Sequence, residues 1–461
     1  MVKTSLSGTT GECINEVKRL YPLDIKDFRS VFGEEINHRL PVEQILSGGY
    51  NCKLLSILVF LSILKARFTM RQSLLVLIGV LVCLVVLNVA FDRAGRQVAP
   101  TDPVFVFQTP ESELTPKQLL GKKLFSDRNL SAPAGQACVD CHAPGTGFAN
   151  PNPNYPDSQG VLKDRFGNRN DLPAGYAAFS PDFHFDQEEG LYVGGQFWDG
   201  RAVDLVEQAK GPFLNPLEMN NPDEKAVVDK IRRADYAGLF REVFGRGAFD
   251  DVKGAYHYAA EAIAEFEKTR EFSPFTSKYD YYLAGKAKLS QQEQRGLALF
   301  EAQDKGNCAA CHPSQPAADG TPPLFTDFTY DNLGVPQNAE LPFYYLPKEL
   351  NPDGVFFVDL GLGGVLEKPE EYGKFKVPSL RNLVKTGPYL HNGFFKTIRQ
   401  VVAFYNTRDV GPWPAPEVKQ NVNREELGDL GLTEREVDDI TAFLLTLTDG
   451  HQPEKNKFQS R

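Results

Sequence analysis

The feature that most constrains this chain is a five-residue pattern that occurs twice. Residues 138–142 read CVDCH and residues 308–312 read CAACH. Cys-x-x-Cys-His is the attachment pattern of c-type haem, in which both thiols add to the porphyrin vinyl groups and the histidine supplies the proximal iron ligand. A single copy would also suit a redox-active thiol pair. Two copies, with no other cysteine after Cys83, favour two covalently bound haem c groups.

The two motifs define the expected cofactor-binding residues. These are Cys138, Cys141, His142, Cys308, Cys311 and His312, with His142 and His312 as the proximal iron ligands. The remaining cysteines, Cys13, Cys52 and Cys83, all precede the first motif. The rest of the chain therefore neither needs nor risks a disulfide, which fits an oxidising compartment such as the bacterial periplasm.

Length and charge limit the classes of partner. The chain has 461 residues, enough for two or three domains. Its net charge is -10 and it has no basic run, which argues against nucleic-acid binding. An acidic balance suits a small basic redox partner.

The N-terminal region contains an apolar segment. Residues 73–91 carry no charge and are long enough to span a bilayer as a helix, and Arg71 gives them the basic start of a signal sequence. We therefore expect residues 70–101 to form a signal peptide or an inner-membrane anchor followed by a linker. Residues 1–69 are interpreted as a non-native extension upstream of a start at Met70, or alternatively as a membrane-associated segment. Both interpretations place the remainder in the periplasm.

An internal repeat surrounds the two motifs. Residues 114–125 (LTPKQLLGKKLF) and 289–300 (LSQQEQRGLALF) share Leu, Ser/Thr, Gly, Leu and Phe in register. Thr115 and Ser290 are good helix N-caps, Pro116 suits the first helical position, and the apolar spacing is that of an amphipathic helix. Each half thus has a helix that leads into its haem motif.

A second, shorter repeat lies near the end of each half. Residues 263–266 (IAEF) correspond to residues 440–443 (ITAF), inside helical patterns that cover 251–270 and 433–447. A helix before the haem and an aromatic-bearing helix after it is the plan of a small c-type cytochrome domain. We expect a mainly α protein with two tandem cytochrome c-like domains, at 102–285 and 286–450, and a tail at 451–461. Each domain would hold one haem among long irregular loops.

The residues available for the far side of each iron are few. Electron-transfer cytochromes c place Met or a second His there. Downstream of the apolar segment the only methionine is Met219, and the histidines outside the motifs are His184, His257, His391 and His451. At least one iron is therefore expected to be open or to have another ligand, which indicates peroxide or oxygen chemistry.

Further segments carry a family resemblance. They are 196–202 (QFWDGRA), 207–212 (EQAKGP), Glu218-Met219, 375–382 (FKVPSLRN) and 387–393 (GPYLHNG). Through these segments, residues 110–450 resemble the bacterial di-haem cytochrome c peroxidase and MauG superfamily. The resemblance implies that peroxide reacts at the first haem.

The resemblance also implies roles for three residues near the first haem. Glu218 matches the distal acid/base residue and Gln208 its polar neighbour, and a carboxyl group near iron can move a proton between the two peroxide oxygens. Trp198 matches the tryptophan between the haems, where an indole can relay electrons. A buried core position is the simpler interpretation of Trp198, and the two are compatible.

A calcium site is implied between the two haems. Asn170, Thr386 and Pro388 match its ligands in the family, where oxygen ligands include backbone carbonyls. Because Asn170 lies in the first half and the other two in the second, such an ion would tie the halves together.

Two departures from typical peroxidases of this family resemble MauG. Residues 143–183 contain no histidine, so the first iron is expected to be five-coordinate without prior reduction. Fourteen residues after His391, where an axial Met is usual for the second haem, the chain has Tyr405. A phenolate ligand lowers the potential and suits storage of oxidising equivalents. Ordinary core packing of Tyr405, with His391 as ligand, is the alternative.

These observations predict a periplasmic di-haem c-type peroxidase. It would reduce hydrogen peroxide to water with electrons from a small cytochrome c or copper protein. Two alternatives stay open: MauG-like oxidative maturation of a partner protein, and a di-haem cytochrome that only transfers electrons.

Overall fold

The computed structural model describes residues 114–152 and 155–453. The expected extension, the export segment and the end of the tail lie outside these residues. Within them, no helix is both long and apolar enough to cross a membrane.

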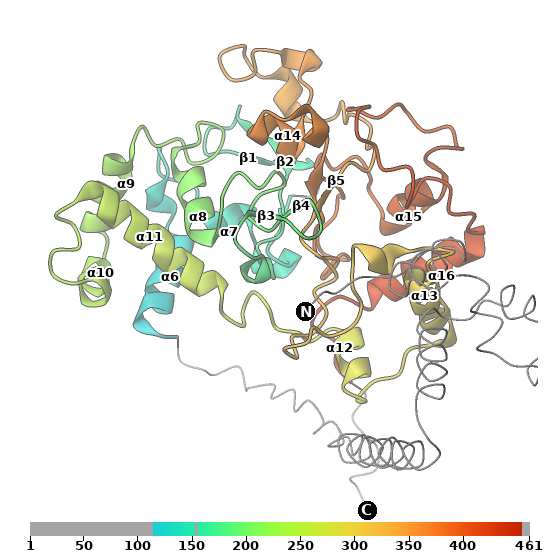
Figure 1. Ribbon diagram of the computed structural model, residues 1–461. Coiled ribbons are helices and arrows are strands. Elements are labelled where there is room, and N and C mark those ends of the chain that lie inside the picture. The colour runs from blue at the N-terminus through green and yellow to red at the C-terminus, as the bar shows by residue number, and fades with distance from the viewer. Residues whose placement is uncertain (1–113, 153–154, 454–461) are drawn as a thin grey trace, which may run out of the picture. The chain divides into compact units, whose positions relative to one another are not determined.

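Helices form most of the regular structure (Figure 1). They are α6 (Pro116–Ser126), α7 (Cys138–Cys141), α8 (Leu205–Leu214), α9 (Glu224–Arg233), α10 (Ala237–Phe244), α11 (Val252–Glu267), α12 (Lys278–Leu283), α13 (Gln291–Glu301), α14 (Gly361–Leu366), α15 (Ile398–Thr407) and α16 (Glu434–Leu445). Short 3-10 turns are η1 (Arg128–Leu130), η2 (Pro144–Thr146), η3 (Ala177–Phe179), η4 (Cys308–Ala310), η5 (Pro342–Tyr345), η6 (Gly354–Phe356) and η7 (Pro369–Glu371). The mainly α prediction is confirmed.

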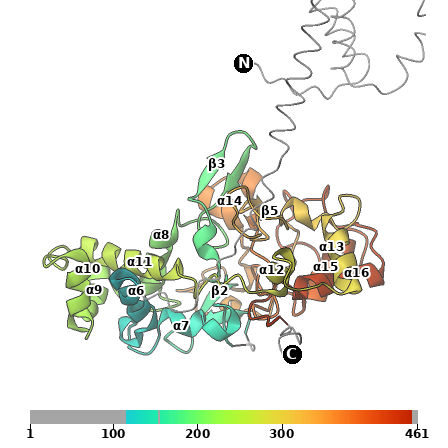
Figure 2. The ribbon, with the colours of Figure 1, turned by 90° about the horizontal axis from the view of Figure 1, so that it is seen from below.

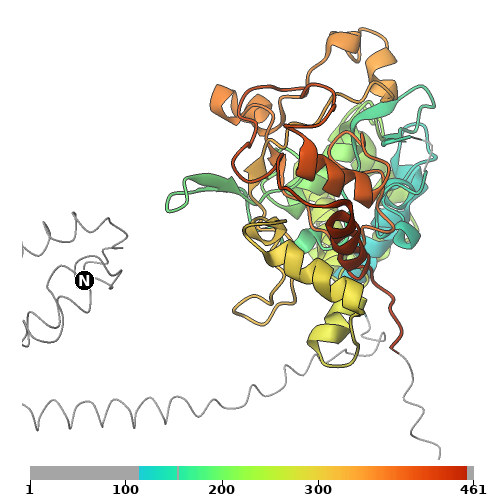
Figure 3. The same ribbon diagram turned by 90° about the vertical axis from the view of Figure 1, so that its right-hand side faces the viewer.

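The strands of the described residues are short and pair only as antiparallel ribbons. The pairs are β1 (Asp157–Gln159) with β2 (Phe166–Asn170), β3 (His184–Asp186) with β4 (Leu191–Val193), and β5 (Tyr330–Asp331) with β6 (Phe375–Lys376). The β3–β4 hairpin projects from the rest of the described chain (Figure 3). Long irregular segments connect these elements, as the sparse strand signals predicted.

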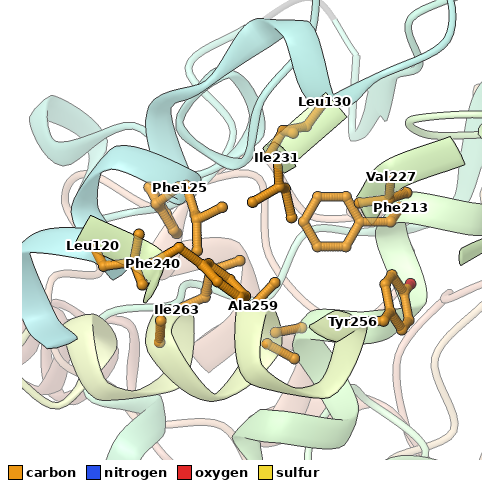
Figure 4. Packing of buried hydrophobic residues seen from close by; sticks show 14 of the residues in the cluster. Leu120, Phe125, Leu130, Phe213, Val227, Ile231, Phe240, Tyr256, Ala259 and Ile263 are labelled. Carbon is orange, nitrogen blue, oxygen red and sulfur yellow. The ribbon is translucent and has the colours of Figure 1, made fainter. Parts of the chain in front are cut away.

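The first hydrophobic core lies around α6 and α11. Thr115 caps α6 by accepting a hydrogen bond from the Gln118 backbone, and the Gln118 side chain accepts one from the Thr115 backbone. The buried face of α6 then presents Leu120 and Phe125 to the core (Figure 4). The predicted helix at 251–270 is α11, and α8, α9 and α10 complete this core.

The second core repeats the arrangement with α13 and α16. Ser290 and Glu293 form the same reciprocal cap at α13, and the helix predicted at 433–447 is α16. Phe300 and Phe443 pack here with their ring centroids 5.2 Å apart. Tyr279 of α12 also packs with this second core, and the domain bounds at 102–285 and 286–450 stay a prediction.

The shared glycine of the repeat explains why the two helix pairs resemble each other. A Cβ added at Gly121 would overlap the carbonyl oxygen of Ala262 and lie 2.8 Å from the Phe266 Cβ. A Cβ added at Gly296 would overlap the carbonyl oxygen of Asp439 and lie 2.8 Å from the Phe443 Cβ. In both halves, therefore, the glycine of the longer repeat packs against the phenylalanine of the shorter repeat: Gly121 against Phe266, and Gly296 against Phe443.

Buried polar groups join the two halves. The Arg169 guanidinium of β2 pairs with Asp199 and with Asp359, each at 2.6 Å. In Figure 2, β2 and α12 lie between the helices of the first core and those of the second. Arg169 therefore joins Asp199, in the first half of the chain, to Asp359, in the second half.

Candidate functional site

Local structure presents the first motif in a fixed way. The thiols of Cys138 and Cys141 stand at the ends of α7, which Asp140 caps by accepting a hydrogen bond from the Ala137 backbone at 2.9 Å. Arg128 holds the same carboxylate at 2.5 Å. His142 follows α7, and its Nδ1 lies 3.0 Å from the carbonyl oxygen of Phe148. A donating Nδ1 leaves Nε2 with a free lone pair, as an iron ligand requires.

The second motif has the same design on a different turn. Cys308–Ala310 forms η4, and His312 places its Nδ1 2.7 Å from the carbonyl oxygen of Phe325. Burial lowers the pKa of His312 to about 4 and also lowers that of His142. Both imidazoles are therefore neutral near pH 7, the form that binds iron.

Each motif lines its own large cavity. Counting open mouths, the empty space is about 1630 Å³ around the first motif and about 1480 Å³ around the second. Burial raises the pKa of Cys138 and of Cys308 to about 12, which favours the neutral thiol at both positions. Two thiols and one neutral imidazole beside an apolar cavity are the donor set that a c-type haem needs.

The two cavities share one wall. Trp198, Lys376, Val377 and Pro378 line both of them. The Trp198 indole is 7% exposed and donates to the carbonyl oxygen of Asn170 at 2.7 Å. Trp198 is thus a buried, hydrogen-bonded residue that lines both cavities, and its role as an electron relay stays a prediction.

Polar residues also line the first cavity. Glu218, Gln208 and Arg201 line it. Glu218 and Arg201 also border a smaller, more open hollow. Burial, together with the charge of Asp171, raises the pKa of Glu218, whereas Arg201 lowers it. A carboxyl group that can hold a proton therefore stands where the cavity meets a polar opening.

The second cavity contains both ligand candidates. Tyr405 of α15 lines it, and burial raises the pKa of its phenol. His391 lines it as well, but its ring stacks on Phe375 at 3.6 Å and its Nε2 lies 3.8 Å from the Glu417 carboxylate. The distal nitrogen of His391 thus faces an acid.

Comparison with known proteins places this geometry in a family. Residues 115–288 match the family model described as di-haem cytochrome c peroxidase. The methylamine utilization protein MauG of Paracoccus denitrificans is 39% identical over 80% of this chain and 95% of its own length. The chain belongs to the di-haem cytochrome c peroxidase family.

Other relatives agree with this assignment. The cytochrome-c peroxidase IdrP1 of Denitromonas iodatirespirans is 30% identical over 80% of this chain and 90% of its own length. The crystal structure of the diheme peroxidase BthA from Burkholderia thailandensis matches with a TM-score of 0.63 and 36% identity, over 73% of this chain and 87% of that one. Membership implies two haem groups and an oxidoreductase, and the two cavities fit two haems.

The expected calcium ligands of this family member are partly brought together. The Asn170 side-chain amide donates to the carbonyl oxygens of Pro388 at 2.7 Å and Leu390 at 3.0 Å. Thr386 is buried two residues before Pro388. Among the described residues, no group of three or more His, Cys, Asp or Glu side chains forms a metal cluster.

The structure places His184 and His257 away from both cavities. His184, weighed as a ligand, is exposed on the β3–β4 hairpin, with its Nδ1 2.8 Å from the carbonyl oxygen of Asp182. His257 is exposed on α11. Neither lines a haem cavity.

Two functional candidates escaped the sequence reasoning. Lys376 is buried in the shared wall, where its ammonium donates to the carbonyl oxygen of Gly195 at 2.7 Å, and burial lowers its pKa to about 7. Glu267 of α11 lines the first cavity, and burial raises its pKa to about 8. Lys376 stands inside the FKVPSLRN segment, so that segment was a usable signal, whereas nothing local marks Glu267.

Proposed function

We propose that this chain is a periplasmic peroxidase that reduces hydrogen peroxide to water with electrons from a small cytochrome c or copper protein. The observation that carries the proposal is the asymmetry of the cavities. Among the described residues, the lining of the first cavity contains His142 and no other histidine, and it also contains Glu218. An iron held by His142 would have one open face, with an acid beside it.

When bound, the haems supply the electrons that break the peroxide O–O bond. Glu218 would accept a proton from the peroxide oxygen nearer the iron and return it to the departing oxygen. Its raised pKa helps the first of these steps, because a carboxylate with a higher pKa accepts a proton more readily. Gln208, in the same lining, would orient the peroxide by hydrogen bonding.

Covalent attachment of each haem through the two thiols of its motif belongs to this proposal.

Trp198 would carry electrons across the shared wall, since it borders both cavities and its N–H is already bound to Asn170. A fixed, buried indole needs no rearrangement before it passes an electron.

Tyr405 is the proposed distal ligand of the second haem. The Glu417 carboxylate lies 3.8 Å from the His391 Nε2, on the side of the ring that an iron would need, which favours Tyr405 over His391 as the ligand. Tyr405→Phe should therefore change the ferric spectrum of the second haem and leave the peroxide reaction of the first in place. An unchanged spectrum would show that Tyr405 is not a ligand.

A calcium ion at Asn170, Thr386 and Pro388 is part of the proposal. Asp157 supports it: the residue pairs with Asn170 across the β1–β2 ribbon, so the two side chains share a face. Both Asp157 carboxylate oxygens are buried without a hydrogen-bond partner in the described part of the chain. A divalent cation with bridging water would supply that partner.

Oxidative maturation of a partner protein is the second candidate. The 39% identity to MauG and the Tyr405 position favour it. Oxidation of a protein precursor of a quinone cofactor, with peroxide and without a small redox donor, would support this candidate over the first.

The test uses the ferric full-length protein. Low-temperature EPR and absorbance should show a high-spin first haem that reacts with peroxide without prior reduction, followed by steady oxidation of a reduced small cytochrome. No spectral change with peroxide would exclude both enzymatic functions and leave electron transfer alone. A reaction that appears only after reduction would contradict the open first iron.

A further inference from the structure

The chain has two tryptophans, and only Trp198 has a role so far. The other, Trp413, follows α15 in the uncharged segment 410–416 (VGPWPAP). It is half-buried, and Pro412 and Pro414 on either side are exposed. Val410 is 64% exposed. An oxidisable aromatic ring therefore lies at the surface close to the helix that carries Tyr405.

Aromatic contacts connect this surface to the second cavity. Tyr405 lines the cavity, and its ring centroid is 6.2 Å from that of Phe404. Phe404 is fully buried and meets Trp413 edge to face at 5.3 Å. Phe395 supports the group, at 4.9 Å from Phe404 and 5.8 Å from Trp413. These separations are those of aromatic pairs in direct contact, so an electron would cross by short steps.

The indole of Trp413 is held in one orientation. Its Nε1 donates to the Thr407 hydroxyl at 3.0 Å, and that hydroxyl donates to the carbonyl oxygen of Ala403 at 2.8 Å. A Cβ at Gly411 would come within 3.2 Å of the indole. The indole N–H therefore has a fixed partner inside the protein, and the ring keeps one position relative to Phe404.

We propose that Trp413 is the entry point through which the donor protein delivers electrons to the second haem, an inference that rests on the proposed peroxidase function. One hydrogen peroxide, two protons and two electrons give two waters. Each electron leaves Trp413 inward past Phe404 and Tyr405, and the reduced donor then returns one electron to the oxidised indole. The donor is oxidised by one electron per step, peroxide is reduced, and Trp413 is unchanged overall.

The surface around Trp413 also specifies the partner. Residues 410–416 have no charged side chain, and the flanking Asp409 is already paired with Arg408 at 2.7 Å and Arg424 at 2.5 Å. A redox protein that contacts this loop should present an uncharged patch around its own cofactor. The rate of electron delivery should then depend only weakly on ionic strength.

The experiment compares Trp413→Phe, Trp413→Tyr and the control Tyr345→Phe in the haem-loaded full chain. Tyr345 is another aromatic residue, 68% exposed, and lies outside the Trp413 contacts. We expect Trp413→Phe to slow oxidation of a reduced small cytochrome about tenfold or more, with unchanged haem spectra and an unchanged peroxide reaction. Trp413→Tyr should recover most of the rate because tyrosine is also oxidisable, and the control should match the wild type.

A second readout does not use turnover. Wild-type protein treated with peroxide and no donor should acquire oxygen at Trp413, as peptide mass spectrometry would detect, and added reduced donor should protect it. Normal donor oxidation by Trp413→Phe, or no modification of Trp413, would overturn the inference while the peroxidase function stands. Absence of any peroxide reaction in the wild type would overturn the peroxidase function itself and this inference with it.

Discussion

At the scale of single residues, the same side chain acquires different chemistry from its surroundings. Glu218 and Glu267 both line the first cavity, and burial raises the pKa of both. Of the two, only Glu218 also borders the smaller, more open hollow beside the first cavity, so only Glu218 can exchange protons readily with solvent. Location relative to water thus separates an acid/base group from a carboxyl that stays protonated.

Replacing the acid tests this distinction. Glu218→Gln should slow the reaction of the ferric protein with peroxide by roughly 10²–10⁴-fold, because the amide cannot transfer the proton. Stopped-flow absorbance measures this rate directly. Glu242→Gln, exposed on α10, is the control and should react like the wild type. Equal rates for Glu218→Gln and the control would remove Glu218 from the mechanism.

Glu267 should make stability depend on pH. Below its ordinary pKa of 4.5 the carboxyl is protonated in the folded and unfolded chain alike. Between 4.5 and about 8 only the unfolded chain releases the proton, so the free energy of unfolding falls by about 1.4 kcal/mol per pH unit. Glu267→Gln cannot lose a proton and should therefore gain stability over the wild type as pH rises through this window.

Denaturant unfolding at the two ends of the window measures the Glu267 effect. Glu265→Gln on the same helix is the control, since its carboxylate pairs with Lys268 at 2.7 Å near the surface. A stability difference between Glu267→Gln and wild type that is the same at both pH values would contradict a raised pKa for Glu267.

At the scale of elements, the glycine of the repeat determines how closely the paired helices pack. A glycine on α6 or α13 lets each helix approach the backbone of its partner, α11 or α16. The capping boxes at Thr115 and Ser290 begin these helices at matching positions, so the glycine meets the phenylalanine of the shorter repeat each time. Caps and apolar spacing were readable from the sequence, which is why these helices were predicted to within a few residues.

Adding a methyl group at either glycine should destabilise the protein. Gly121→Ala and Gly296→Ala each force backbone and side chain apart, and we expect a loss of about 1–3 kcal/mol in the free energy of unfolding. Gly238→Ala, on α10, is the matched control because its added methyl group meets nothing within 4 Å. That control should be neutral or stabilise the protein, since alanine favours helices over glycine. Unfolding curves of the three variants decide the point.

At the scale of the whole molecule, the two halves are joined by buried charge and by the shared cavity wall. The Arg169 guanidinium lies between Asp199 and Asp359, and burial of these groups strengthens the electrostatic attraction within each ion pair. Trp198 and Lys376, from opposite halves of the chain, line both cavities. Communication between the two sites therefore depends on how the halves dock.

Removing the central charge should loosen this docking. Arg169→Gln leaves Asp359 buried without its cation and should lower the free energy of unfolding by about 3–5 kcal/mol. Arg399 also contacts two carboxylates, Glu434 at 2.5 Å and Asp438 at 2.7 Å, but at the surface. Arg399→Gln should therefore cost less than about 1 kcal/mol. Equal losses for both variants would show that burial adds nothing at Arg169.

The haem motifs, the two-fold repeat, the helix starts and the mainly α class could all be predicted from the sequence, because they depend on residues close together in the chain. Family resemblance added Glu218, Gln208, Trp198 and Tyr405, and the structure places all four in the cavity linings. Three relations became visible only in the folded protein: the two cavities share a wall, Glu417 faces His391, and Trp413 connects through Phe404 to Tyr405. Most of these relations join side chains far apart in sequence, and all of them depend on packing that local spacing does not encode.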